Sequence, residues 1–169
     1  LPEEHFVTAF FGVLDTVMHR VDYHAAGQGP LLHFQAATGI CRWLSPTTFP
    51  LGFMKFPEID PPHQIDLAPG DILGLITDGV FERENPAGAM FGTAGVEQVL
   101  RTRHEGSMSD LLARLLQAVH VFAYGHPQGD DITIVLLARR GETAGRTTIQ
   151  RYFPRSLESL DGVVMMAAH

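Results

Sequence analysis

The feature that most constrains this sequence is a continuous apolar run in its last third. The segment "ITIVLLARR" (132–140) has an unbroken apolar run from Ile134 to Ala138, and only Thr133 separates this run from Ile132. A strand with this pattern lies inside a sheet that is covered on both faces. The segment "ILGLI" (72–76) is a second apolar run of this kind. The chain is therefore expected to fold into layers around a buried sheet.

The first half of the chain is predicted to consist of antiparallel strands. Aromatic and β-branched residues are frequent there, and short polar or glycine-containing segments separate the apolar ones. The expected hairpins pair 6–14 with 20–27, 30–34 with 39–44, and 63–67 with 72–76, the last pair across the turn "APGD". The proline-rich segment 45–62 has no periodicity and is expected to be a loop.

Two helices are predicted after these strands. Segment 93–103 carries apolar residues on one face, and segment 107–124 has a longer Leu and Val stripe at helical spacing. Ser107 can cap the second helix, and Gly125 follows where a terminating glycine is expected. Strands, then helices, then one returning strand indicate an α+β fold of stacked layers and not a repeated βαβ unit.

Composition excludes several classes of function. The formal charge is −7, from 19 acidic and 12 basic residues, and there is no basic run, so no nucleic-acid partner is expected. Cys41 is the only cysteine, which excludes an internal disulfide and fits a reducing compartment. No apolar segment has transmembrane length and no signal sequence opens the chain. We expect a cytoplasmic protein without a membrane partner.

Carboxylates stand at the ends of both apolar runs. Asp78 follows one in "ITDGVFE", and Asp130 and Asp131 precede the other in "GDDITIV". If these strands are antiparallel neighbours, Asp78 and Asp130 converge at one edge of the sheet. Like charges that close require a cation, or one of them must be protonated. Oxygen ligands without a cysteine or histidine pattern favour Mg²⁺ or Mn²⁺ over zinc.

Simpler interpretations of the same residues stay open at this point. Asp78 and Gly79 could form a plain Asp-Gly turn, and Asp130 and Asp131 could be solvated residues before a strand. The nine histidines are scattered and form no HExxH-type ligand pair. An unrelated β-rich ligand-binding domain would leave Asp78 far from Asp130 and Asp131 in space.

The order of motifs resembles a known family. The motifs are "FVTAFFGVLD", "YHAAGQGPLL", "FPLGF", "LAPGDILGLITDGVFE" and "GDDITIVLLARR". This order is similar to that of bacterial PPM-type (protein phosphatase 2C-like) serine/threonine phosphatases, in the branch of the sporulation stage II E phosphatase and the stress-sigma-factor regulators. The resemblance covers residues 5–140.

The resemblance implies a fold and a metal site. The fold is a four-layer αββα sandwich of antiparallel sheets flanked by helices, here as a partial domain. Two Mn²⁺ or Mg²⁺ ions lie at the sheet edge, with Asp78 and Asp130 as ligands. Asp131, Gly79 and Gln28 are expected beside these ligands without binding an ion directly. The family's "AGH" motif is Ala26-Gly27-Gln28 here, and Gln28 cannot exchange a proton near neutral pH.

The resemblance also implies an activity. It is hydrolysis of phosphoserine or phosphothreonine by water that the metal ions activate, without a phosphoenzyme and without Cys41 as nucleophile. The implied partner is a phosphorylated regulatory protein such as an anti-sigma-factor antagonist, in bacterial signal transduction and stress response. The alternative is a catalytically degenerate adaptor that binds a regulator. The sequence leaves the oligomeric state open, a homodimer included.

We expect the chain to be an interior piece of a longer protein. The family's first acidic motif, an aspartate before a glycine-histidine-glycine turn, is expected upstream of residue 1, where it supplies the ligand that bridges the two ions. Residues 1–140 would then be an N-terminally truncated phosphatase domain with weak metal binding and slow turnover. Residues 141–146 are predicted as a linker. Residues 147–169 are predicted as the start of a following domain that resembles an anti-sigma kinase.

Overall fold

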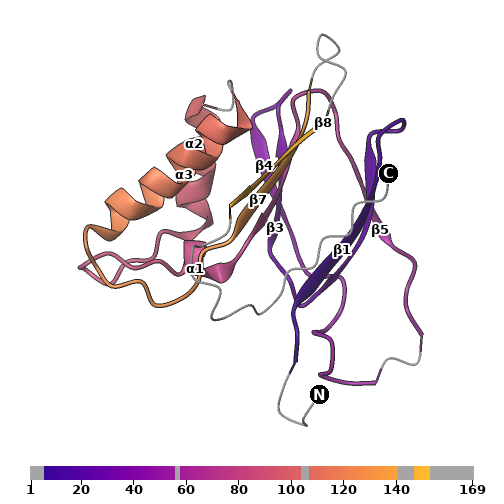
Figure 1. Cartoon of the computed structure of the whole chain (residues 1–169), viewed down its shortest axis with the longest axis horizontal. Coiled ribbons are helices and arrows are strands. Elements are labelled where there is room, and N and C mark those ends of the chain that lie inside the picture. Colours follow the sequence, from indigo (N-terminus) through magenta and orange to yellow (C-terminus); the bar gives the residue numbers. More distant parts are fainter. Residues whose placement is uncertain (1–5, 56–57, 104–106, 141–146, 153–169) are drawn as a thin grey trace.

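The computed structural model describes residues 6–55, 58–103, 107–140 and 147–152, which form two antiparallel sheets and three helices (Figure 1). The first sheet has the strand order β1-β2-β5, and the second has the order β4-β3-β6-β7-β8. The strands are β1 (Ala9–Asp15), β2 (Arg20–Ala26), β3 (Leu31–Gln35), β4 (Ile40–Leu44), β5 (His63–Asp66), β6 (Ile72–Ile76), β7 (Ile134–Arg139) and β8 (Thr147–Tyr152). The helices are α1 (Asp78–Phe81), α2 (Gly92–Arg103) and α3 (Met108–Ala123).

The first two predicted hairpins are confirmed. β1 pairs with β2 in a register that places Asp15 opposite Arg20, and β3 pairs with β4. The first turn closes without a glycine because Oδ1 of Asp15 accepts hydrogen bonds from the amides of Val17 (2.9 Å) and Met18 (2.8 Å). These two bonds stabilise the charged carboxylate and lower the pKa of Asp15 below its usual value.

The third predicted hairpin is wrong. β5 pairs with β2 in the three-stranded sheet, whereas β6 lies between β3 and β7 in the five-stranded sheet. The segment "APGD" is therefore a corner where the chain passes from one sheet to the other. Burial follows this division, since β5 buries only Ile65 and β6 buries all of its residues. A tight turn reverses the chain but does not require the strands on either side to pair with each other.

The central strands β6 and β7 are covered on both faces, as their apolar runs predicted. Successive side chains of a strand point to opposite faces, so each strand contributes to two cores. The residues on the helix side are Ile72, Ile76, Ile134 and Leu136, and those on the side of the three-stranded sheet are Leu73, Leu75, Val135 and Leu137. This double burial holds the ends of β6 and β7 in a fixed position.

Helices α2 and α3 cover the outer face of the five-stranded sheet (Figure 1). α3 begins as predicted, because Oγ of Ser107 accepts a hydrogen bond from the Asp110 amide (3.0 Å). It ends at Tyr124, which has a left-handed φ of 41°, and Gly125 follows with φ 79°. In the described parts of the chain, the helices are too short or too polar to cross a membrane.

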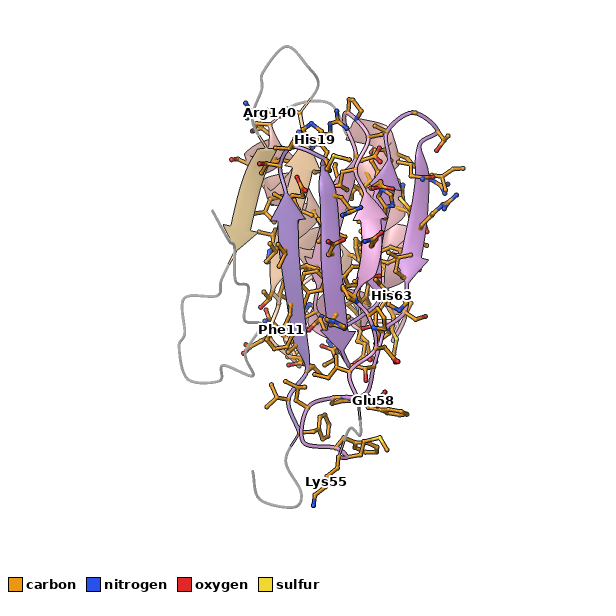
Figure 2. All side chains as sticks on the ribbon, turned by 90° about the vertical axis from the view of Figure 1, so that its right-hand side faces the viewer. Phe11, His19, Lys55, Glu58, His63 and Arg140 are labelled. Carbon is orange, nitrogen blue, oxygen red and sulfur yellow. The ribbon has the colours of Figure 1, made fainter. Side chains whose placement is uncertain are left out.

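The described residues supply three of the four layers of the predicted sandwich. These layers are the helices, the five-stranded sheet and the three-stranded sheet (Figure 1). Figure 2 looks onto the outer face of the three-stranded sheet, where no helix of the described residues lies. Phe11 and Val13 of β1 are partly exposed on this face. The fold is therefore a partial αββα sandwich.

The structure attaches residues 147–152 to the five-stranded sheet. They form β8, which pairs with β7 in antiparallel register. The sequence analysis assigned them to a following domain, because a polar, glycine-containing segment separates them from β7. The predicted linker (141–146) and residues 153–169 lie outside the described residues.

A buried hydrogen-bond cluster around Asp71 stabilises the corner before β6. The Asp71 carboxylate accepts hydrogen bonds from Nε2 of His33 (3.0 Å) and from the amides of Ala36 (2.9 Å) and Ala68 (3.1 Å). Asp71 is 3% exposed and His33 is 7% exposed, so the ring nitrogen of His33 cannot turn to bulk water instead. We expect Asp71→Ala to lower the free energy of unfolding by about 3 kcal/mol, because it leaves the buried His33 ring and two partly buried amides without their acceptor.

Urea denaturation measures this effect, with Asp66→Ala on the exposed part of β5 as the matched control. Equal unfolding midpoints for the two variants would show that the Asp71 cluster does not hold the corner.

Candidate metal centre

Asp78 follows β6, and Asp130 and Asp131 precede β7; we call these two stretches the acidic segments. They lie at the same end of the strands of the five-stranded sheet, and "this edge" below means that end. β6 ends at Ile76 and β7 begins at Ile134, and these two residues are partners in the antiparallel register. The condition on which the predicted convergence depended, adjacent antiparallel strands, is therefore met. Asp78 and Gly79 do not form a hairpin turn, because they open α1 directly after β6.

Thr77 binds the two segments together. Its amide donates to the Thr133 carbonyl (3.0 Å), and its Oγ1 accepts a hydrogen bond from the Thr133 amide (2.8 Å). The same hydroxyl donates to the Asp131 carbonyl (3.2 Å). The residue directly before Asp78 is thus joined to the segment that carries Asp130.

Gly79 lies directly against the other acidic segment. A Cβ atom at this buried position would be 2.3 Å from the carbonyl oxygen of Asp131 and 3.3 Å from that of Asp130. The first distance is shorter than any van der Waals contact, and the opposing atom is a backbone oxygen that cannot rotate away. Only glycine allows the two segments to approach so closely.

Both candidate ligand side chains are exposed at this edge. Oδ1 of Asp78 accepts a hydrogen bond from the Gly79 amide (3.0 Å), and Oδ1 of Asp130 accepts one from the Asp131 amide (2.7 Å). Within the described parts of the chain, the second carboxylate oxygen of each residue makes no hydrogen bond or ion pair. Each aspartate therefore has one oxygen available to a ligand. Asp131 is half-buried, and its carbonyl faces Thr77 and Gly79.

Gln28 lies at the same end of the five-stranded sheet. It precedes β3, and Leu32 of β3 is opposite Gly74 of β6, so the start of β3 is at the edge where β6 ends. Gln28 is 6% exposed, and it follows Gly27, which has a φ of 69°. Among the described contacts, no hydrogen bond joins Gln28 to Asp78 or Asp130.

The donor set fits part of a hard-cation site. Mg²⁺ and Mn²⁺ prefer oxygen ligands, and Mg²⁺ is commonly held by one or two carboxylates together with water and phosphate oxygens. Asp78 and Asp130 supply two such carboxylates on segments in direct contact. In the described ranges, no three His, Cys, Asp or Glu side chains come together, so a zinc site of four protein ligands is not formed there.

Cys41 has no role at this edge. It lies on β4 and packs with the helix-side core. Burial, with the nearby Glu97 carboxylate as a smaller cause, raises the pKa of the Cys41 thiol to about 11. The side chain is therefore a neutral thiol at neutral pH and a poor nucleophile.

Two residues at this edge escaped the sequence analysis, Thr77 and Arg83. Arg83 follows α1, and its guanidinium donates to the carbonyls of His126 and Pro127. No local pattern marks either residue, because their partners are backbone groups more than forty positions away.

Comparison with known proteins identifies a sequence family that matches most of the chain. Residues 1–140 match the sequence profile of the family described as "Stage II sporulation protein E (SpoIIE)". Protein IcfG of Synechocystis sp. is 29% identical over 136 residues, a match that covers 79% of this chain and 21% of IcfG. The chain thus spans about a fifth of this curated relative.

Solved structures show the same fold. The SiaA-PP2C domain of Pseudomonas aeruginosa has a TM-score of 0.60 at 22% identity, over 76% of this chain and 49% of that one. The phosphatase domain of the cell fate determinant SpoIIE from Bacillus subtilis has a TM-score of 0.59 at 15% identity, over 79% and 56%. The RsbU and RsbW domains of Rv1364c from Mycobacterium tuberculosis have a TM-score of 0.56 at 26% identity, over 76% and 35%.

Proposed function

The chain belongs to the SpoIIE family, and we propose that it is part of a metal-dependent phosphatase that hydrolyses phosphoserine or phosphothreonine in a regulatory protein. Its solved neighbours are described as PP2C and phosphatase domains, which supports the reaction type. An unrelated β-rich binding domain is excluded by the family match and by the contact between the two acidic segments.

The observation that carries the proposal is this contact. Gly79 lies against the carbonyls of Asp130 and Asp131, and Thr77 is hydrogen-bonded to Asp131 and Thr133. Segments 52 residues apart in sequence are thereby fixed side by side, each with an exposed aspartate. Two like-charged carboxylates on segments held so closely together repel each other unless a cation binds between them, so this arrangement does not stabilise the fold by itself.

In this proposal Asp78 and Asp130 hold the metal through their available carboxylate oxygens. Bound Mn²⁺ or Mg²⁺ supplies Lewis acidity, which lowers the pKa of water and neutralises charge on the phosphate. Thr77 and Gly79 keep both segments in place before the metal arrives, so that little reorganisation is needed on binding. Asp131 and Gln28 support this edge from half-buried and buried positions.

The proposed substrate is a regulatory phosphoprotein, an anti-sigma-factor antagonist in the most specific form of the proposal. One neighbour is described as a cell fate determinant, which supports a signalling substrate over a metabolite. We further propose that the protein acts in the cytoplasm in stress or sporulation signalling, and that a second domain follows β8. A neighbour that contains both RsbU and RsbW domains supports such a multidomain organisation.

One observation favours the alternative of an adaptor without catalysis. In the described residues, Asp78 and Asp130 are not joined by a third side chain of the metal-binding types to form a larger cluster. If the remaining ligands are absent from the whole protein, a phosphatase fold that binds a phosphorylated regulator without hydrolysing it would result. The same reasoning predicts that the 169-residue chain alone binds metal weakly and turns over slowly.

Phosphate release by the full-length protein tests the proposal. We expect release from phosphoserine and phosphothreonine proteins in the presence of Mn²⁺, no release after EDTA treatment, and none from a phosphotyrosine protein at any metal concentration. Binding of a phosphorylated regulator without phosphate release at saturating Mn²⁺ would support the adaptor and overturn the enzyme proposal.

A further inference from the structure

The segment between α3 and β7, which carries Asp130, is held at only a few points. Residues 127–130 are exposed, so packing contributes little to their position. Gln128 donates to the carbonyl of Asp130 (2.8 Å), but this bond lies within the segment and does not attach it to the rest of the fold. The position of Asp130 therefore depends on contacts at the two ends of the segment.

Both of these anchors come from the segment that carries Asp78. Thr77 binds the end nearest β7, through Asp131 and Thr133. Arg83 binds the end nearest α3, where its two terminal nitrogens donate to the consecutive carbonyls of His126 and Pro127. One short piece of chain, 77–83, thus holds both ends of the other acidic segment.

We propose that Arg83 is a positioning residue that sets the place of Asp130 relative to Asp78. This inference rests on the proposed function, since it concerns the affinity of the same metal site. Among the described contacts, Arg83 has none with either aspartate side chain, and it acts through the backbone of residues 126 and 127. Substitution of a residue that orients metal ligands without binding the ion typically weakens metal affinity about 10- to 100-fold. We expect an effect at the lower end of this range for Arg83.

The chemistry of the contact requires arginine. A guanidinium is a planar fork whose two nitrogens can donate to two acceptors at once, whereas a lysine ammonium is a single point charge. Lysine at position 83 keeps the charge but cannot bridge the carbonyls of His126 and Pro127 in the same way. Arg83→Lys therefore separates the effect of the clamp from the effect of charge.

The test uses the full-length protein and has two readouts besides activity. Calorimetry gives the Mn²⁺ dissociation constant of the wild type, Arg83→Lys and Arg83→Ala, with Arg42→Ala on the exposed edge strand β4 as the control of equal charge. Hydrogen–deuterium exchange of the metal-free proteins reports the opening of residues 126–131. We expect both Arg83 variants to bind Mn²⁺ about 10-fold more weakly and to exchange faster in this segment, with Arg42→Ala unchanged.

The Mn²⁺ affinities of the wild type and the two Arg83 variants distinguish the results that would overturn the inference. Wild-type affinity in Arg83→Ala would show that the clamp does not position the site, whatever the exchange rates. Wild-type affinity in Arg83→Lys alone would show that charge and not the fork is what matters. If the wild type binds no Mn²⁺, the proposed function fails together with this inference, whereas tight wild-type binding with unaffected Arg83 variants removes only the inference.

Discussion

Gly79→Ala is expected to lower the free energy of unfolding by about 3 kcal/mol. Helix propensity alone would favour alanine by about 1 kcal/mol at this position in α1. The added Cβ would, however, lie 2.3 Å from the carbonyl oxygen of Asp131. Because that oxygen belongs to the backbone, the two acidic segments have to move apart. The clash therefore outweighs the gain in propensity.

Urea denaturation of the wild type and Gly79→Ala measures this effect, and Gly129→Ala is its matched control. Gly129 precedes Asp130 on the opposing segment, and a Cβ there meets no atom within 4 Å. The control is expected to unfold within about 0.5 kcal/mol of the wild type. Equal destabilisation by both substitutions would show that the segments are not packed as described.

The second large effect concerns catalysis. Asp78→Asn and Asp130→Asn are each expected to lower kcat/KM for Mn²⁺-dependent phosphate release at least about 10³-fold, or about 4 kcal/mol of transition-state stabilisation. Asparagine keeps the shape of the side chain but removes the charge that binds the cation. Both aspartates are exposed, so stability should change by less than about 1 kcal/mol.

Two further substitutions serve as references for these losses of kcat/KM. Asp131→Asn, at a half-buried position beside the proposed ligands, is expected to have an effect of about 10-fold. Asp66→Asn, on the exposed part of β5, is expected to have none. Wild-type kcat/KM in Asp78→Asn or in Asp130→Asn would remove that residue from the proposed set of ligands.

The elements with a strong local pattern could be predicted from sequence. The apolar run of β7, the Leu and Val stripe of α3 and the Ser107 cap each appear where their patterns place them. The pairing of β5 and β6 could not be predicted, because "APGD" is compatible both with a hairpin and with a corner between sheets. The edge position of β8 was missed for a similar reason, since a polar segment can connect strands as well as domains.

The candidate site was predictable only in part. The sequence places Asp78 and Asp130 at the ends of two buried strands, but only the register of Ile76 with Ile134 shows that these ends meet. Thr77, Gly79 and Arg83 act on backbone carbonyls of the opposing segment. Backbone carbonyls carry no sequence signal, so the contacts that hold the two segments together become visible only in three dimensions.

Electron paramagnetic resonance of Mn²⁺ added to the full-length protein tests the central claim most directly, that Asp78 and Asp130 together hold a cation. The free ion gives a sharp signal that falls when the ion binds. We predict that the wild type and Asp66→Asn deplete this signal, and that Asp78→Asn and Asp130→Asn each leave most of it in place. Depletion by either of these variants at wild-type affinity, or no depletion by the wild type, would contradict the claim.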